Sequence, residues 1–139
     1  MLNYCIVFDM DETLGFFAQI SRLWLTLQEL NNNTLRSSDF FELCELFPRI
    51  LRPNIIQILK YVFTFKNDNL SKIILYTNNT GPKWWTYLVV EYIEHKIGHR
   101  IFDVVIPGFK AHNSCRKSAL KTYEDLVRCS NISEKQKIC

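Results

Sequence analysis

The sequence lacks the cysteine spacings that indicate a structural role. The chain has 139 residues and five cysteines, Cys5, Cys44, Cys115, Cys129 and Cys139, with no Cys-x-x-Cys pair among them. An odd number without paired spacing argues against a disulfide framework and against a zinc site. We therefore expect an intracellular protein of a reducing compartment, cytoplasmic or nuclear.

Long apolar runs and a strong net charge are also missing. No apolar stretch reaches about 18 residues, and no cationic segment precedes an apolar one at the amino terminus, so neither a membrane span nor a signal peptide is expected. The formal net charge of +3 does not indicate nucleic-acid binding on its own. A hydrophobic share of 47% predicts one globular domain over residues 1–139, whose oligomeric state stays open.

The stretch from Tyr4 to Gly15 carries the clearest chemical signal. Residues 5–8 are apolar and predict a buried strand, which is followed at once by Asp9, Asp11 and Thr13. Because side chains alternate along a strand, both carboxylates can point into one crevice at the strand's carboxyl end. Two carboxylates this close repel each other unless a cation lies between them or one keeps its proton.

This Asp-x-Asp-x-Thr segment resembles the first motif of the haloacid dehalogenase-like (HAD) superfamily of phosphatases and phosphotransferases. The resemblance implies that Asp9 is the nucleophile that attacks phosphorus, that Asp11 is the general acid and base, and that both bind Mg²⁺. Asp-Met-Asp-Glu-Thr-Leu is also similar to the signature of the branch that includes the RNA polymerase II C-terminal-domain phosphatases. In that branch an Arg-Pro pair precedes the next helix, as Arg52-Pro53 does here, although Arg52 can equally be a solvated charge.

Strands alternate with helices along the rest of the chain. We expect strands over residues 73–76 and 102–106 and a fourth beginning at residue 138, with a polar turn over 66–71. Helices are expected near residues 16–30 (or an irregular flap there), 38–47 with Ser38 and Asp39 as caps, 55–63 capped by Asn54, 83–97, and 123–129 behind a Thr122-x-x-Asp125 capping box. This order predicts an α/β fold, a doubly wound parallel sheet of the HAD-like Rossmann type. A small helical flap or cap insertion would occupy residues 15–53.

Two further motifs concern phosphate binding. The second predicted strand ends in Thr77-Asn78 just before a helix amino terminus, where hydroxyl, amide and free N–H groups can donate to an anion. This resembles the second HAD motif, and implies that Thr77 and Asn78 orient the phosphoryl group. The third HAD element is a Lys, for which Lys110, Lys117 and Lys121 are the possibilities. We favour Lys121 because it directly precedes a predicted helix that faces the strand ends, with Lys117 second.

The fourth HAD motif, an acidic pair after the last strand, is missing from the sequence, which stops at Lys137-Ile138-Cys139. Either the chain continues in a longer product, or the protein never had these acids. The Asn-, Ile- and Lys-rich composition, with Leu-Arg-Pro-Asn-Ile and Tyr-Thr-Asn-Asn, is also similar to HAD-like proteins of large DNA viruses.

The leading hypothesis is a Mg²⁺-dependent phosphatase that acts through an aspartyl-phosphate on Asp9. Two alternatives remain: a catalytically inactive HAD-like binding module, or a phosphatase of a small metabolite or nucleic-acid end. The short insertion leaves the predicted site poorly covered, which favours a phosphorylated substrate that brings its own cover, such as a phosphoprotein. Phe16, Phe17 and Trp24 could instead fold over the crevice as a minimal lid.

Overall fold

The structure is a computed structural model that describes residues 4–66, 68, 70–112, 114–133 and 136–139. In these residues the chain forms a four-stranded, all-parallel sheet in the order β3-β2-β1-β4, built from β1 (Tyr4–Phe8), β2 (Leu70–Tyr76), β3 (Val104–Ile106) and β4 (Lys137–Ile138). The helices of the described residues are α1 (Ala18–Leu30), α2 (Ser37–Glu45), α3 (Ile55–Thr64), α4 (Lys83–Ile97) and α5 (Tyr123–Ser130). The prediction of an α/β fold with a parallel, Rossmann-like sheet is confirmed at this level.

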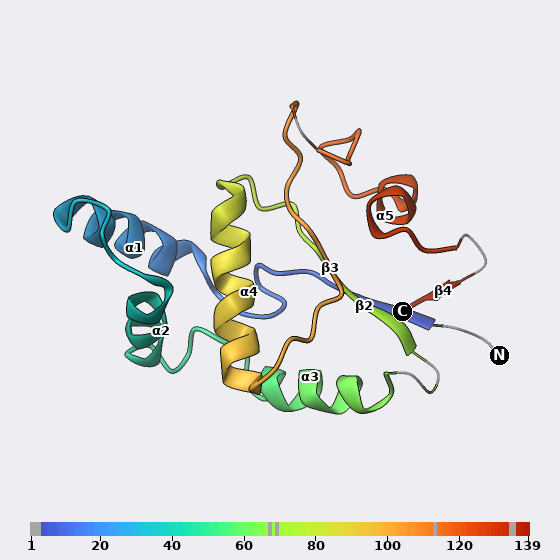
Figure 1. The fold of residues 1–139 in the computed structure, drawn as a ribbon, viewed down its shortest axis with the longest axis horizontal. Coiled ribbons are helices and arrows are strands. Elements are labelled where there is room, and N and C mark those ends of the chain that lie inside the picture. The colour runs from blue at the N-terminus through green and yellow to red at the C-terminus, as the bar shows by residue number, and fades with distance from the viewer. Residues whose placement is uncertain (1–3, 67, 69, 113, 134–135) are drawn as a thin grey trace.

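The sheet is covered on both faces, and the side chains of β2 show how. Ile73 and Leu75 belong to the larger core, which α1 to α4 also line. Ile74 and Tyr76 point the other way, into a smaller core that includes Leu126 of α5. Figure 1 shows α3 and α4 on one side of the sheet and α5 on the other. Burial on both faces explains why residues 73–76 of this strand are a continuous apolar run instead of an alternating one.

The segment between β1 and α3 forms two helices, of which α2 packs against both α1 and α4. The ring of Phe40 in α2 lies edge-on to Trp24 of α1 at 5.2 Å and to Trp85 of α4 at 5.4 Å between centroids. Trp24 is only 2% exposed, so it belongs to the core and does not act as a lid. Aromatic pairs in this geometry stabilise a contact beyond the area they bury. These two helices are therefore attached to α4 through an aromatic cluster.

Helix boundaries follow the predicted signals at some ends and depart from them at others. α4 follows Pro82 and stops at Gly98, whose φ of 95° is the left-handed conformation that glycine adopts without strain. The predicted cap of α3 is wrong, since Asn54 is itself left-handed and its side chain makes no capping bond. α2 begins one residue earlier than expected because Asp39 accepts a hydrogen bond from the backbone N–H of Arg36 at 2.7 Å.

Two strand boundaries also differ from the predictions. The third strand starts at residue 104 rather than 102, because Phe102 is buried against Phe8 and the Asp103 carboxylate accepts the backbone N–H of Ile73 at 2.8 Å. The predicted turn over 66–71 ends earlier, since β2 begins at Leu70; residues 67 and 69 of that turn lie outside the described residues. The predicted fourth strand is present as β4, which pairs in parallel with β1.

The expectation of a chain without disulfides is wrong. Cys115 and Cys129 form a disulfide with 5.4 Å between their Cα atoms, which ties the loop before α5 to the helix itself. Cys5 and Cys44 are free and buried, and Cys139 is free and exposed. The cysteine count did not reveal this pair, because an odd total is compatible with one disulfide and free cysteines beside it. The spacing of the two residues also matches no known motif. In the described residues, no helix is long and apolar enough to cross a membrane.

Loss of the disulfide should destabilise the folded protein. The bond closes a loop with a sequence separation of 14, and a closed loop of that size restricts the unfolded chain by about 3 kcal/mol. We expect Cys115→Ser with Cys129→Ser to lower the free energy of unfolding by about 2–4 kcal/mol in urea denaturation. Cys139→Ser is the control, because that thiol is free and exposed. Identical urea midpoints with and without a reductant would contradict the prediction.

Candidate active site

Asp9 and Asp11 lie at the carboxyl end of β1, the strand between β2 and β4. Met10, between them, is fully buried, so the alternation of side chains turns both carboxylates away from that core. The chain then closes a tight turn in which Glu12 donates its backbone N–H to the carbonyl of Gly15 at 2.8 Å. A Cβ on Gly15 would stand 2.4 Å from the carbonyl oxygen of Ile50, so only glycine fits this position.

Arg52 stabilises the same turn from outside. Its Nε donates to the carbonyl oxygen of Glu12 at 2.7 Å, and its guanidinium lies 5.6 Å from the ring centroid of Phe16. The backbone of Arg52 also donates to the carbonyl of Leu14 at 3.0 Å. The side chain of Arg52 is therefore hydrogen-bonded to the turn that follows Asp9 and Asp11.

Lys121 reaches the first carboxylate from the far end of the chain. Its Nζ lies 2.6 Å from Oδ1 of Asp9, and both side chains are about one-third exposed (34% and 38%). It also lies 5.7 Å from the ring centroid of Tyr76, whose hydroxyl accepts the backbone N–H of Thr122. The other two lysines are placed differently: Nζ of Lys110 donates to the carbonyl of Thr80, and the backbone N–H of Lys117 donates to Asp125. Lys121 is thus the lysine that the structure brings to Asp9.

The loop after β2 approaches the second carboxylate. Thr77 is 1% exposed, and its Oγ1 accepts the backbone N–H of Asn79 at 3.0 Å. Asn79 in turn donates from Nδ2 to Oδ2 of Asp11 at 2.9 Å and accepts the N–H of Gly81. The side-chain oxygen of Asn78 is bonded to Arg116 instead. The sequence prediction therefore missed Asn79, which the Asn-Asn repeat alone could not separate from its neighbour.

Arg116 is the second residue that the sequence prediction missed. It is 3% exposed and lies beneath the loop after β2, donating to the carbonyl of Thr77 at 2.9 Å and to Oδ1 of Asn78 at 2.7 Å. Further bonds reach the carbonyls of Pro107 and Ala119, and the guanidinium lies 4.8 Å from the ring centroid of Tyr76. All four of these acceptors are neutral oxygens, so the bonds satisfy the two terminal nitrogens without cancelling the positive charge, and the buried Nε has no hydrogen-bond partner among the described residues. A buried positive charge beside a loop favours an anion bound to that loop.

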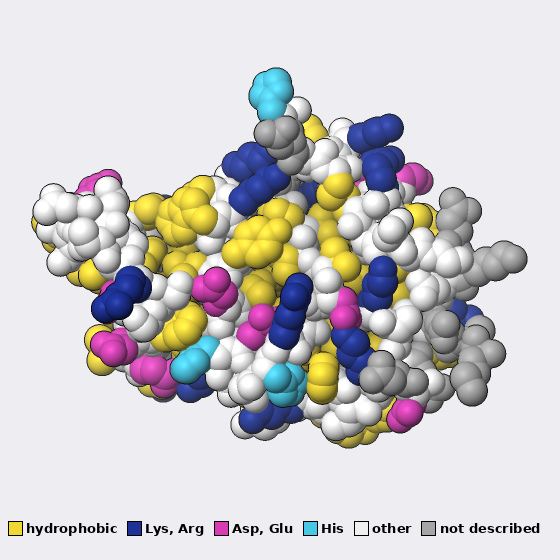
Figure 2. Space-filling view, in the orientation of Figure 1, with side chains coloured by type: hydrophobic (Ala, Val, Ile, Leu, Met, Phe, Trp, Pro, Cys, Tyr) yellow, Lys and Arg dark blue, Asp and Glu magenta, His cyan; other side chains and the backbone are white. Residues whose placement is uncertain are grey.

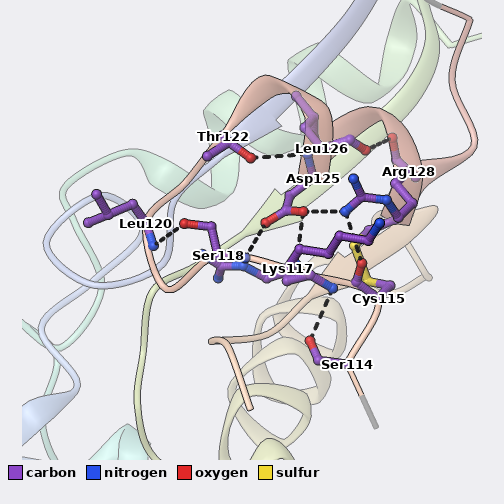
Figure 3. A network of polar contacts seen from close by, with 12 residues as sticks. Ser114, Cys115, Lys117, Ser118, Leu120, Thr122, Asp125, Leu126 and Arg128 are labelled. Carbon is purple, nitrogen blue, oxygen red and sulfur yellow. Dashed lines mark hydrogen bonds and ion pairs between the residues drawn. A yellow bond between two sulfur atoms is a disulfide. The ribbon is translucent and has the colours of Figure 1, made fainter. Parts of the chain in front are cut away.

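Asp125 holds the loop that carries Lys121. Its carboxylate is 2% exposed and accepts the backbone N–H groups of Lys117 and Ser118, each at 3.0 Å, while Arg128 pairs with it from the next turn of α5 (Figure 3). The predicted capping box is only half formed, because Thr122 accepts the N–H of Asp125 at 3.1 Å but the Asp125 carboxylate bonds to this loop instead. Burial alone would raise the pKa of Asp125, yet the hydrogen bonds from both N–H groups and the Arg128 charge lower it below the ordinary value.

The lowered pKa of Asp125 predicts a dependence of stability on pH. Because the folded state prefers the ionised carboxylate, its stabilising contribution is complete above the ordinary Asp pKa of about 3.9 and is lost as the pH falls below it. We expect the free energy of unfolding of the wild type to exceed that of Asp125→Asn at neutral pH. This difference between the two proteins should become smaller from about pH 5 to about pH 3, the range in which Asp titrates. Urea denaturation across that range measures it. A gap that is constant with pH would contradict the assignment.

The carboxylates also bear on metal binding. Among the described residues, no group of three or more His, Cys, Asp and Glu side chains is arranged to hold a metal ion. Mg²⁺, however, commonly takes only one or two protein carboxylates and completes its shell with water and substrate phosphate. Asp9 and Asp11 are two carboxylates that could serve as such ligands at one edge of the sheet. The donor set therefore fits Mg²⁺ in chemistry and is incomplete as a closed protein site.

Together these contacts divide the edge of the sheet into two sides. Asp9 faces Lys121 on one side, and Asp11 faces Asn79 on the other. The buried Thr77 and the charge of Arg116 lie at the neighbouring strand end. Such an arrangement can bring a nucleophilic oxygen, a proton donor and positive charge to one phosphate group. No protein family model, no curated protein and no solved structure matches this chain.

Proposed function

We propose that this protein is a HAD-like, Mg²⁺-dependent phosphatase that hydrolyses phosphate monoesters through an aspartyl-phosphate on Asp9. The observation that carries the proposal is the ion pair between Asp9 and Lys121 beside Asp11 at the carboxyl end of β1. Open parallel sheets bind ligands in the crevice beyond the carboxyl ends of their strands, which is where these three residues lie. The resemblance of the first motif to the HAD superfamily supports the same reaction.

The first half of the reaction forms the covalent intermediate. A carboxylate oxygen of Asp9 attacks phosphorus, the bond from phosphorus to the ester oxygen breaks, and Asp11 gives a proton to the departing oxygen. Lys121 offsets the negative charge that builds up between the nucleophile and the phosphate. Thr77 and its loop hold the phosphoryl oxygens, with Arg116 fixing the loop from below. When bound to Asp9 and Asp11, Mg²⁺ would add further positive charge at the same place.

The second half releases phosphate. Asp11, now a carboxylate, takes a proton from water as the water oxygen attacks phosphorus, and the bond to Asp9 breaks. The reaction regenerates Asp9 as a carboxylate and returns the proton to Asp11. Because one group serves as acid and then as base, the mechanism needs no second proton carrier.

A non-catalytic phosphate-binding module is the second candidate. One observation favours it: in the described residues both carboxylates already have partners, Asp9 in Lys121 and Asp11 in Asn79. A site whose carboxylates already have partners can bind a phosphate group without hydrolysing its ester.

Phosphate release from 4-nitrophenyl phosphate, with Mg²⁺ and with EDTA, separates the two candidates. The phosphatase should release phosphate only with Mg²⁺ and should carry a covalent, hydroxylamine-sensitive phosphate after an acid quench. Binding of inorganic phosphate in calorimetry without any turnover would overturn the phosphatase and leave the binding module.

A further inference from the structure

A cavity of about 600 Å³ opens beside Asp11, between the start of α1 and the start of α4. Its size lies within the range of small-molecule sites in proteins. Asp11 and Asn79 form part of its wall, whereas Asp9 does not line it. The cavity is therefore continuous with one side of the candidate active site, the side that holds the second carboxylate.

The position of Asp11 indicates which part of the substrate the cavity would hold. This inference rests on the proposed reaction. The group that protonates the departing oxygen must face the part of the substrate that departs. Asp11 faces the cavity, while Asp9 and Lys121 mark the phosphoryl side. The organic group of the phosphate ester therefore extends into the cavity.

Two aromatic side chains line this cavity and are half exposed. Phe16 is 51% exposed and comes from the turn before α1, and Trp84 is 46% exposed and comes from the first turn of α4. Neither is loosely held: the Arg52 guanidinium lies over Phe16, and Trp84 meets the buried Trp85 edge-on at 6.3 Å between centroids. Figure 2 shows hydrophobic side chains gathered over α4 and beside α1 on this face. Half-exposed rings held by such contacts can pack against a flat, aromatic partner.

We propose that the substrates are aromatic phosphate monoesters, whose ring lies in the cavity against Phe16 and Trp84. An aliphatic group of similar reactivity would bury less area and would not stack. Arg22, which also lines the cavity, can meet a polar or acidic group carried beyond the ring. Tyrosine phosphate in a protein and a free aryl phosphate share this chemistry.

The test compares benzyl phosphate with ethyl phosphate, two esters with alkoxide leaving groups that differ in the ring. In the wild type, kcat/KM should favour benzyl phosphate, and Phe16→Ala or Trp84→Ala should reduce that preference by roughly three- to tenfold. Tyr87→Ala is the matched control, because Tyr87 is an equally exposed aromatic of α4 that does not line this cavity. A preference that is unchanged in both cavity variants would overturn the proposal and leave the phosphatase assignment intact.

Binding without turnover separates this inference from the proposed function. Calorimetry should give a tighter Kd for phenylphosphonate than for methylphosphonate in the wild type, and Trp84→Ala should remove most of the difference. If no ester is hydrolysed but this difference is found, the phosphatase assignment fails and the aromatic cavity stands. Equal affinity for the two phosphonates would overturn the aromatic cavity. Turnover of O-phosphotyrosine, free and within a peptide, then distinguishes a small substrate from a protein.

Discussion

Asp9→Asn should reduce hydrolysis of 4-nitrophenyl phosphate in the presence of Mg²⁺ by on the order of 10⁴-fold or more. An amide cannot attack phosphorus and form the aspartyl-phosphate, so the substitution removes the covalent route itself. The variant should also fail to retain phosphate after an acid quench. Both quantities are measured on protein purified in parallel with the wild type.

Unfolding would not account for such a loss. The ion pair between Asp9 and Lys121 is partly exposed, and pairs of this kind contribute about 0–1 kcal/mol to stability. The variant should therefore unfold at nearly the urea concentration of the wild type. Asp68→Asn, a substitution of the same type at an exposed turn residue, is the control and should keep full activity. Equal turnover by wild type and Asp9→Asn would exclude Asp9 as the nucleophile.

Asp11→Asn should have a smaller effect that depends on the leaving group. Loss of general acid and base catalysis costs about 10²–10⁴-fold. The deficit should be larger for ethyl phosphate than for 4-nitrophenyl phosphate, because a good leaving group departs without a proton. A deficit of the same size for both esters would indicate that Asp11 contributes through the metal or through Asn79 instead.

Arg116→Met should be among the most destabilising single substitutions in the described part of the chain. The guanidinium donates to the carbonyls of Thr77, Pro107 and Ala119 and to Oδ1 of Asn78, and the substitution leaves acceptors in a buried region without their donor. Each unsatisfied buried group costs about 1–3 kcal/mol, so we expect a loss of about 2–5 kcal/mol in the free energy of unfolding. Urea denaturation measures it. Arg49→Met, at an exposed arginine, should change stability by less than about 0.5 kcal/mol.

Arg116→Lys tests whether this residue also positions the phosphate loop. Lysine keeps the charge but cannot make the forked contacts of the guanidinium. We expect KM for 4-nitrophenyl phosphate to rise more than kcat falls, because in the proposed reaction the loop of Thr77 binds the phosphoryl oxygens, and the substitution leaves the proposed nucleophile and acid in place. A variant that loses stability but keeps the wild-type KM would limit Arg116 to a structural role.

Much of the fold follows from local patterns in the sequence. The apolar run before Asp9 and the run ending at Tyr76 form neighbouring strands, in which β-branched or aromatic residues dominate. The run ending at Tyr76 is buried on two faces, whereas the strand before Asp9 is only partly buried apart from Cys5. Gly98 ends α4 because glycine alone adopts its left-handed conformation without cost. The meeting of Lys121 with Asp9 also follows from order along the chain, since the segment before α5 must return to the edge where parallel strands end.

Apart from the contact of Lys121 with Asp9, the tertiary structure alone decided the contacts made by the loop before α5. Arg116 looks like any surface arginine in the sequence, and it is buried only because this loop folds back over the end of β2. The same return brings Cys115 to Cys129 and turns the Asp125 carboxylate from its expected capping bond to the N–H groups of Lys117 and Ser118. These contacts satisfy buried polar groups across the fold, and such pairing depends on which groups are left without water once the elements have packed. No periodicity or local spacing carries that information, whereas strand burial and helix ends depend on neighbours in the chain.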